Sequence, residues 1–167
     1  FTTLHAGGKF DDAAYKTSGG LHGVGSSVVN ALSLHMDVEI SRDGKIHHDH
    51  YEKGVPVLEL DDGLLPVLGK TKKTGTKVNF LPDPEIFDRT DFKEDEILSR
   101  LHEMAYLNPT LKIHFEDRRQ GKELTEDYHE PDGLKGYVTE LNKASEPVCG
   151  AIFVSGESEG IKVEAAT

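Results

Sequence analysis

The sequence predicts an α+β domain in which helices cover one face of a mostly antiparallel sheet. Segments in which apolar and polar residues alternate outnumber the segments with helical periodicity. Turn signals join several of these alternating segments at hairpin distance, and the clearest of them is Asp43-Gly44. Because strands joined by short hairpins run antiparallel, these two observations together determine the fold class.

The first half of the chain predicts one helix and four strands. Residues 1–20 are rich in Gly, Lys, Asp and Ser and have little periodicity. An apolar pattern after them predicts a helix over residues 24–34. Met36, Val38 and Ile40 alternate with polar residues, so we expect a strand over 36–41 and, beyond the Asp43-Gly44 turn, its partner over 45–52. The expected elements that follow are a short strand and a loop within 53–73, then a strand over 76–81 that ends at Pro82.

The second half predicts two helices and two hairpins. Apolar residues recur at helical spacing from Ile97 to Ala105, after an acidic start. Alternation predicts strands near 111–115 and 122–129, and Leu134 to Leu141 reads as a helix. A closing hairpin is expected over 150–155 and 160–165. The polar, proline-bearing segment 143–147 marks the expected boundary between a domain at 1–143 and a second domain that begins within 144–167.

Length and composition limit the possible functions. A chain of 167 residues fits one domain and part of a second. Its net charge of −11 argues against this segment gripping DNA, because duplex binding relies on Lys and Arg at the phosphates. One cysteine, Cys149, cannot form an internal disulfide, which suits a reducing cytoplasm. No run of about 18 apolar residues predicts a membrane span.

A glycine-rich segment, Ser18 to Ser27, is the strongest candidate for chemistry. It carries four glycines in a G-x-x-G-x-G arrangement and runs directly into the predicted helix. Glycine allows positive φ and close approach of a ligand, and a helix start offers unpaired N–H groups to an anion. The segment lacks the Gly-Lys-Ser/Thr of a Walker loop and the spacing of a dinucleotide fingerprint. The residues alone leave two interpretations open: a polyphosphate site, or a tight turn at a helix start.

Three sequence segments allow a more specific interpretation of this glycine-rich region. They are Leu4-His5-Ala6-Gly7-Gly8-Lys9-Phe10, Tyr15-Lys16-Thr17-Ser18-Gly19-Gly20-Leu21-His22-Gly23-Val24-Gly25 and Ser27-Val28-Val29-Asn30-Ala31-Leu32-Ser33. Together they resemble the ATP lid and phosphate loop of type IIA DNA topoisomerase B subunits. Thr74-Gly75-Thr76-Lys77-Val78 resembles the late strand of that family at the floor of the adenine pocket. The resemblance covers essentially the whole chain, is looser after Phe87, and is nearer to the B subunits of bacterial DNA gyrase than to those of topoisomerase IV.

The resemblance implies a fold and a domain plan. The family has the two-layer sandwich shared with Hsp90, histidine kinases and MutL, and here it would be incomplete at its N-terminus. Residues 1–143 would be the C-terminal part of the ATP-binding domain, with the lid at 1–20 and the phosphate loop at 18–25. Residues 144–167 would begin the transducer domain. We therefore expect the chain to be a fragment of a longer polypeptide.

The resemblance also implies the binding residues. The expected ATP contacts are Gly8, Lys9, Tyr15, Gly20, Leu21, His22, Gly23, Val24, Gly25 and Thr76. Lys9 would meet a phosphate, and His22 would contribute mainly its backbone. Thr76 would reach adenine through an aspartate and a water, and that aspartate would lie upstream of Phe1. Arg42 and Val78 would line the rim of the adenine pocket, where aminocoumarin drugs bind in gyrase-like proteins.

The same family places the catalytic groups outside this chain. The general-base glutamate and the asparagine that holds Mg²⁺ would lie upstream of Phe1, and a lysine for the γ-phosphate beyond Thr167. We thus expect no catalytic residue and no metal ligand here, and no ATPase activity from the chain alone. The parent would use ATP and Mg²⁺, dimerise through its N-terminal regions, join a gyrase A-type subunit in an A2B2 heterotetramer, and contact DNA through other regions.

Several alternatives remain beside this interpretation. Histidine kinases, Hsp90-type chaperones and MutL-type proteins share the lid chemistry, but the intact glycine strings disfavour them. A topoisomerase IV B subunit and a non-catalytic nucleotide-binding module also stay open. His47, His48 and His50 invite a metal-site interpretation, since alternation places His48 and His50 on one strand face. An exposed strand is favoured there, because no third ligand has suitable spacing.

Overall fold

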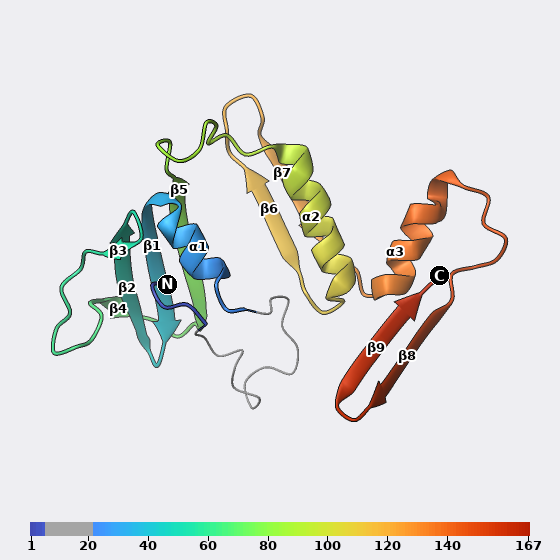
Figure 1. Cartoon of the computed structure of the whole chain (residues 1–167), viewed down its shortest axis with the longest axis horizontal. Helices are drawn as coiled ribbons and strands as arrows, with labels where there is room; N and C mark the ends of the chain where they lie inside the picture. Colours follow the sequence, from blue (N-terminus) through green and yellow to red (C-terminus); the bar gives the residue numbers. More distant parts are fainter. Residues whose placement is uncertain (6–21) are drawn as a thin grey trace. The chain divides into compact units, whose positions relative to one another are not determined.

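The computed structural model describes residues 1–5 and 22–167. Two compact units make up the chain, Phe1–Asp91 and Phe92–Thr167 (Figure 1). Residues 6–20 of the predicted lid at 1–20, and residues 18–21 of the predicted phosphate loop at 18–25, lie outside the described residues.

The described residues of the first unit form an antiparallel sheet and one helix. Helix α1 (Gly25–Ala31) precedes β1 (Ser33–Arg42), β2 (Lys45–Glu52), β3 (Val55–Pro56), β4 (Val67–Lys70) and β5 (Gly75–Pro82). The strands lie in the order β3-β2-β1-β5, and β4 also pairs with β2. Every strand pair in this sheet is antiparallel, as the sequence predicts.

The β1–β2 hairpin sets the register of the sheet. Asp43 and Gly44 have φ angles of 51° and 79°, and two positive φ angles in a two-residue loop suit the right-handed twist of the flanking strands. The hairpin pairs Arg42 with Lys45 and, further along, Met36 with Tyr51. The predicted strand 45–52 coincides with β2, and the predicted strand 36–41 lies within β1.

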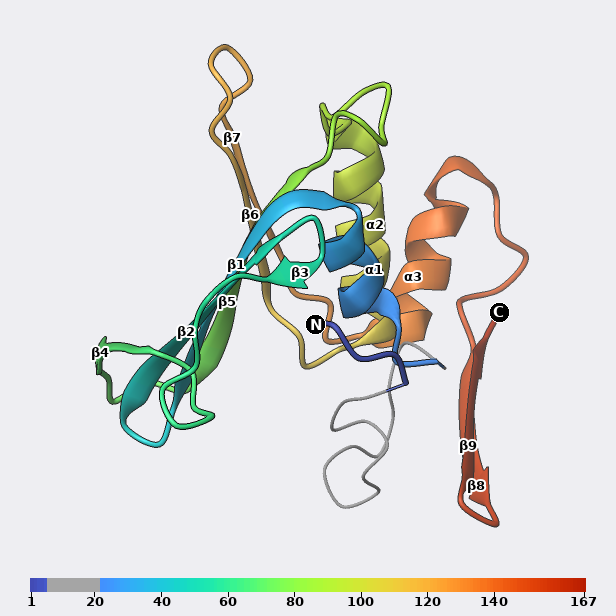
Figure 2. The same cartoon turned by 60° about the vertical axis from the view of Figure 1, so that its left-hand side comes forward.

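One face of this sheet forms the core of the first unit. Met36 and Val38 of β1 are 1% exposed and cluster with Tyr51 of β2, and Phe1 and Ile40 pack against them. The Phe1 and Tyr51 rings lie 5.9 Å apart. In both views α1 lies beside the strands (Figures 1 and 2). Side chains in β-strands alternate between faces, so the intervening positions of β1 occupy the opposite face of the sheet.

Helix α1 is shorter than the predicted helix over 24–34. Leu32 ends it, and Ser33 already pairs with Pro82 of β5. The N–H of Asp83 donates to the carbonyl of Leu32 at 3.0 Å. The helical periodicity of the sequence continues past Ala31, but Ser33 pairs with β5 and the carbonyl of Leu34 accepts from the N–H of Lys53 at 3.1 Å, so the backbone of both residues has partners outside the helix.

The second unit contains two helices and two separate hairpins. Its elements are α2 (Glu94–Leu107), β6 (Ile113–Asp117), β7 (Leu124–Tyr128), α3 (Gly133–Leu141), a 3-10 turn at Asn142–Ala144, β8 (Phe153–Ser158) and β9 (Ile161–Ala166). Three acidic residues, Glu94, Asp95 and Glu96, occupy the first turn of α2, where the helix dipole favours them.

A row of stacked rings joins α2 to its neighbours. His102 stacks on Tyr106 of the same helix and on Tyr128 of β7, with ring centroids 4.7 and 4.8 Å apart. Tyr106 also stacks on Tyr137 of α3 at 5.1 Å. His102 Nε2 lies 2.8 Å from a carboxylate oxygen of Glu130. These contacts hold α2, α3 and β7 together, which periodicity alone does not predict.

The closing hairpin lies later than the predicted strands at 150–155 and 160–165. Its turn is formed by Glu159 and Gly160, whose φ angles are 52° and 79°. That turn places β8 at Phe153–Ser158, three residues later than predicted. The predicted domain boundary after residue 143 falls inside the second unit and stays a prediction. None of the helices that the structure describes combines the length and apolar character needed to cross a bilayer.

Candidate functional site

The start of α1 forms the described end of the predicted phosphate loop. Gly23 has φ of +61°, in the left-handed region where a residue without Cβ is favoured. The first turn of an α-helix leaves N–H groups without helical partners, and among the described residues no side chain caps this one. Of the predicted phosphate contacts, His22, Gly23, Val24 and Gly25 are described. The others, Gly8, Lys9, Tyr15, Gly20 and Leu21, lie outside the described residues.

Buried polar side chains fix α1 in place. The Ser27 hydroxyl donates to the carbonyl of Thr3 at 3.0 Å. The amide of Asn30, which is 1% exposed, donates to the carbonyls of Phe1 and Gly54 at 3.2 and 3.4 Å. Gly54 has φ of +81°, and a Cβ there would lie 3.0 Å from the Cα of Ala31. Close packing of the β2–β3 turn against α1 therefore sets the direction in which the helix start points.

The predicted adenine residues share the core face of the sheet. Thr76 lies opposite Ile40, and Val78 lies opposite Val38. Counting by twos along β1 from Val38 and Ile40 puts Arg42 on the same face. Val78 is 42% exposed, and the Arg42 side chain is 76% exposed. The fold thus brings Thr76, Val78 and Arg42 onto the face where Phe1 packs, and their contacts with a nucleotide stay predictions.

Two carboxylates of β1 lie on the other face. His50 Nδ1 and His48 Nε2 both donate to one oxygen of Asp37, at 2.7 and 3.1 Å. Partial burial pushes the pKa of Asp37 upward, but hydrogen bonds from His50 and His48 outweigh it, so this pKa lies below its ordinary value. Glu39 accepts from Lys77 at 2.8 Å. Neither carboxylate faces the side of the sheet that holds Thr76 and Val78.

Asp49 is an acidic residue on the core face that no sequence motif singles out. It pairs with Val38 in the hairpin register and therefore shares the face of Val78. The Tyr51 hydroxyl donates to one of its oxygens, and the N–H of His50 donates to the other at 3.0 Å. Burial raises the pKa of Tyr51 well above its ordinary range, and the Asp49 carboxylate adds to this effect. The sequence does hold one clue to Asp49: in a two-residue hairpin at Asp43-Gly44, counting outward from the turn pairs Asp49 with Val38.

Two of the three histidines of β2, His48 and His50, hydrogen-bond Asp37 within the sheet. His48 and His50 share one face with Asp37, as alternation predicts, while His47 lies on the other. Among residues 1–5 and 22–167, no group of three or more His, Cys, Asp or Glu side chains has the arrangement to hold a metal ion. The hydrogen bonds to Asp37 occupy one ring nitrogen of each of these two histidines.

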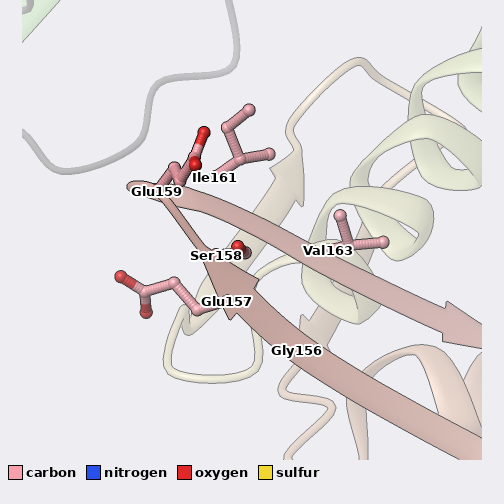
Figure 3. A pocket seen from close by; sticks show the side chains of 6 residues that line it. All are labelled: Gly156, Glu157, Ser158, Glu159, Ile161 and Val163. Carbon is pink, nitrogen blue, oxygen red and sulfur yellow. The ribbon is translucent and has the colours of Figure 1, made fainter.

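A shallow hollow on the β8–β9 hairpin lies among other residues. Figure 3 shows its lining, which includes Glu157, Glu159 and Val163. The carboxylates of Glu157 and Glu159 point in different directions. None of these lining residues is a predicted nucleotide contact.

Comparison with known proteins shows what the chain is similar to. No protein-family model matches it. The DNA gyrase B subunit of Bacillus mycoides is 47% identical over 164 residues, covering 97% of this chain and 39% of that protein. The DNA gyrase B subunit of Enterococcus faecalis is 48% identical, and the DNA topoisomerase 4 B subunit of Staphylococcus aureus is 50% identical. Each of these two alignments covers 98–99% of this chain and 25% of the relative.

Comparison with solved structures identifies the fold. The crystal structure of the 43K ATPase domain of Thermus thermophilus gyrase B, in complex with an aminocoumarin, matches with a TM-score of 0.74. The match is 37% identical in sequence and covers 86% of this chain and 38% of that one. The predicted α+β fold of this ATPase type is therefore confirmed. The chain spans between a quarter and about two fifths of the length of these relatives.

Proposed function

Because this chain belongs to the family of type IIA DNA topoisomerase B subunits, we propose that it is the ATP-binding part of a gyrase B protein. In that protein, binding and hydrolysis of ATP would drive DNA strand passage and negative supercoiling. The observation that carries the proposal is 47–48% identity to gyrase B proteins along nearly the whole chain. Likeness to a gyrase B ATPase domain supports the nucleotide as ligand.

The chain's own residues would bind the triphosphate and adenine. The glycine loop would present backbone N–H groups to the phosphates from residues 20–25, helped by the dipole of α1. Positive φ at Gly23 supports this role. Lys9 would add a compact cation, and Gly8 and Tyr15 further lid contacts. Thr76 would serve adenine, with Val78 and Arg42 at the rim.

Catalysis would need groups from elsewhere in the polypeptide. Asp37, Glu39 and Asp49 are all engaged by other side chains. This supports a general base outside the chain, and we assign that role to a glutamate upstream of Phe1. Magnesium would neutralise charge on the phosphates, with its asparagine ligand also upstream. The role of these 167 residues would then be to bind and orient ATP.

The remaining assignments follow from the same family. We propose that residues 1–143 belong to the ATP-binding domain and that 144–167 begin the transducer domain. The whole protein would dimerise through its N-terminal regions on binding ATP and assemble with a gyrase A-type subunit as A2B2. Cys149 is exposed and free, which suits the reducing cytoplasm where we place the enzyme.

A supercoiling assay tests the proposal. The full-length protein, reconstituted with a gyrase A-type subunit, relaxed plasmid and Mg²⁺-ATP, should introduce negative supercoils. The alternative is the B component of a topoisomerase IV, which the 50% identity to the Staphylococcus aureus protein favours. Decatenation of linked circles without supercoiling, with either A-type partner, would replace the gyrase assignment. Failure to bind ATP would support a non-catalytic module.

A further inference from the structure

Three neighbouring strands place like charges side by side at one end of the first sheet. Arg42 of β1 pairs with Lys45 of β2, and Lys45 pairs with Lys70 of β4. Directly paired residues lie on the same face with Cβ atoms about 5 Å apart, and like charges there lower stability. The three cations thus form a row across β1, β2 and β4, on the face that also holds Thr76 and Val78.

The loop after β4 adds two more lysines to this row. The N–H of Thr71 donates to the carbonyl of Gly44 at 3.0 Å, which ties the loop to the β1–β2 turn. The N–H of Lys73 donates to the Thr71 hydroxyl at 3.0 Å and closes a local turn. Lys72 and Lys73 are consequently held beside the hairpin. We call the five exposed side chains Arg42, Lys45, Lys70, Lys72 and Lys73 the cationic end; Arg42 is its border with the proposed adenine-pocket rim, and the four lysines are its part that the proposed nucleotide site does not include.

The charges of the cationic end are almost uncompensated within the described chain. Arg42 has one acidic neighbour, Asp43 at 3.6 Å, and both side chains are highly exposed. In residues 1–5 and 22–167, no carboxylate forms an ion pair with any of the four lysines. Elsewhere in the described chain five of eight lysines form an ion pair, among them Lys53 and Lys77 with a glutamate at 2.6–2.8 Å, and the unpaired ones do not adjoin one another in a strand register. In a protein of net charge −11, such a gathering of unpaired cations favours an external anion.

We propose that the cationic end is a docking surface for the phosphate backbone of duplex DNA. Lysines on flexible stems act as point charges, and duplex DNA offers one negative charge per about 1.7 Å of its axis. Binding an anion there would also relieve the repulsion along the row. The overall negative charge predicts weak DNA contact for the chain as a whole, whereas this end is locally positive. The proposal rests on the proposed function in one respect, that the protein works on DNA.

The test measures DNA binding with a matched pair of variants of the 167-residue chain. Lys70→Gln/Lys72→Gln removes two charges from the cationic end. The control variant, Lys112→Gln/Lys122→Gln, removes two exposed lysines of the second unit, so the two double variants have the same net charge. Fluorescence anisotropy of a labelled duplex, titrated from about 50 to 200 mM salt, gives affinity and salt slope. Circular dichroism of each variant verifies that it is folded.

The first variant should weaken DNA binding at least about tenfold at the lowest salt concentration and lower the salt slope by about 2, as the loss of two phosphate contacts requires. The control variant should stay within about twofold of the wild type. Equal losses in both variants, or no binding by the wild type, would overturn the proposal. Equally tight binding of poly-glutamate at matched charge would instead identify an acidic protein as the partner.

A nucleotide titration separates this proposal from the proposed function. In the full-length protein, Lys70→Gln/Lys72→Gln should leave the affinity for a fluorescent ATP analogue unchanged. Loss of ATP binding by the wild-type protein would contradict the proposed function and leave the DNA result standing. Loss of ATP binding in the variant alone would reassign the cationic end to the nucleotide and overturn its role as a DNA surface.

Discussion

Replacing Gly23 tests whether the loop backbone holds phosphate. Its φ of +61° lies in the left-handed region, which costs an L-residue with a Cβ roughly 1–2 kcal/mol. If the bound loop needs this conformation, Gly23→Ala should weaken nucleotide binding by about 5- to 30-fold, since about 1.4 kcal/mol is a factor of ten. Gly23→Val should abolish detectable binding, because a β-branched side chain is still less tolerated at positive φ.

The measurement is calorimetric titration of the full-length protein with a non-hydrolysable ATP analogue, accompanied by a thermal melt. Gly121→Ala is the matched control, because Gly121 has φ of +76° in the β6–β7 turn and a Cβ there would meet nothing within 4 Å. It carries a similar backbone cost and should leave the affinity unchanged. Normal ATP binding by folded Gly23→Val protein would refute the phosphate cradle, and an equal loss in Gly121→Ala would trace the effect to general destabilisation.

Three more predictions concern the charge of Lys9, the activity of the 167-residue chain alone, and the pairing of Asp117 with Arg119. Lys9→Ala in the full-length protein should weaken ATP binding by roughly 1.5–3 kcal/mol, the worth of a charge-assisted contact; unchanged affinity by calorimetry would remove Lys9 from the site. The 167-residue chain alone should release no phosphate from Mg²⁺-ATP, and turnover above a Lys9→Ala control would point to an overlooked base on the face of Thr76, such as Asp49, since Asp37 and Glu39 lie on the opposite face. Hydrogen bonds from Arg119 hold the pKa of Asp117 at about 2, below its ordinary 3.8. The folded-state pKa is the lower one, so its contribution to stability is present above about pH 4 and is lost as the pH falls from about 4 to 2. Urea unfolding of Arg119→Gln should show a smaller acid-dependent loss across that window, and a loss identical to the wild type would exclude this ion pair as its source.

The local elements and the family can be predicted from the amino-acid sequence. Asp43-Gly44 predicts a two-residue turn because both positions tolerate positive φ, and the alternation on either side then sets the β1–β2 register. The glycine strings and the helical pattern after them predict the site, since the requirement for glycine is a property of single residues. Each of these inferences needs only neighbours within a few residues.

Contacts between segments that are distant in the sequence depend on the three-dimensional fold. Pairing of Ser33 with Pro82 shortened α1, and the stacking of His102 on Tyr128 joined α2 to β7. Strand pairing likewise brings the histidines of β2 to Asp37, and Lys70 at the end of β4 to Lys45. Periodicity states which face a side chain occupies, but the partner on that face depends on strand order and register, which the whole fold sets.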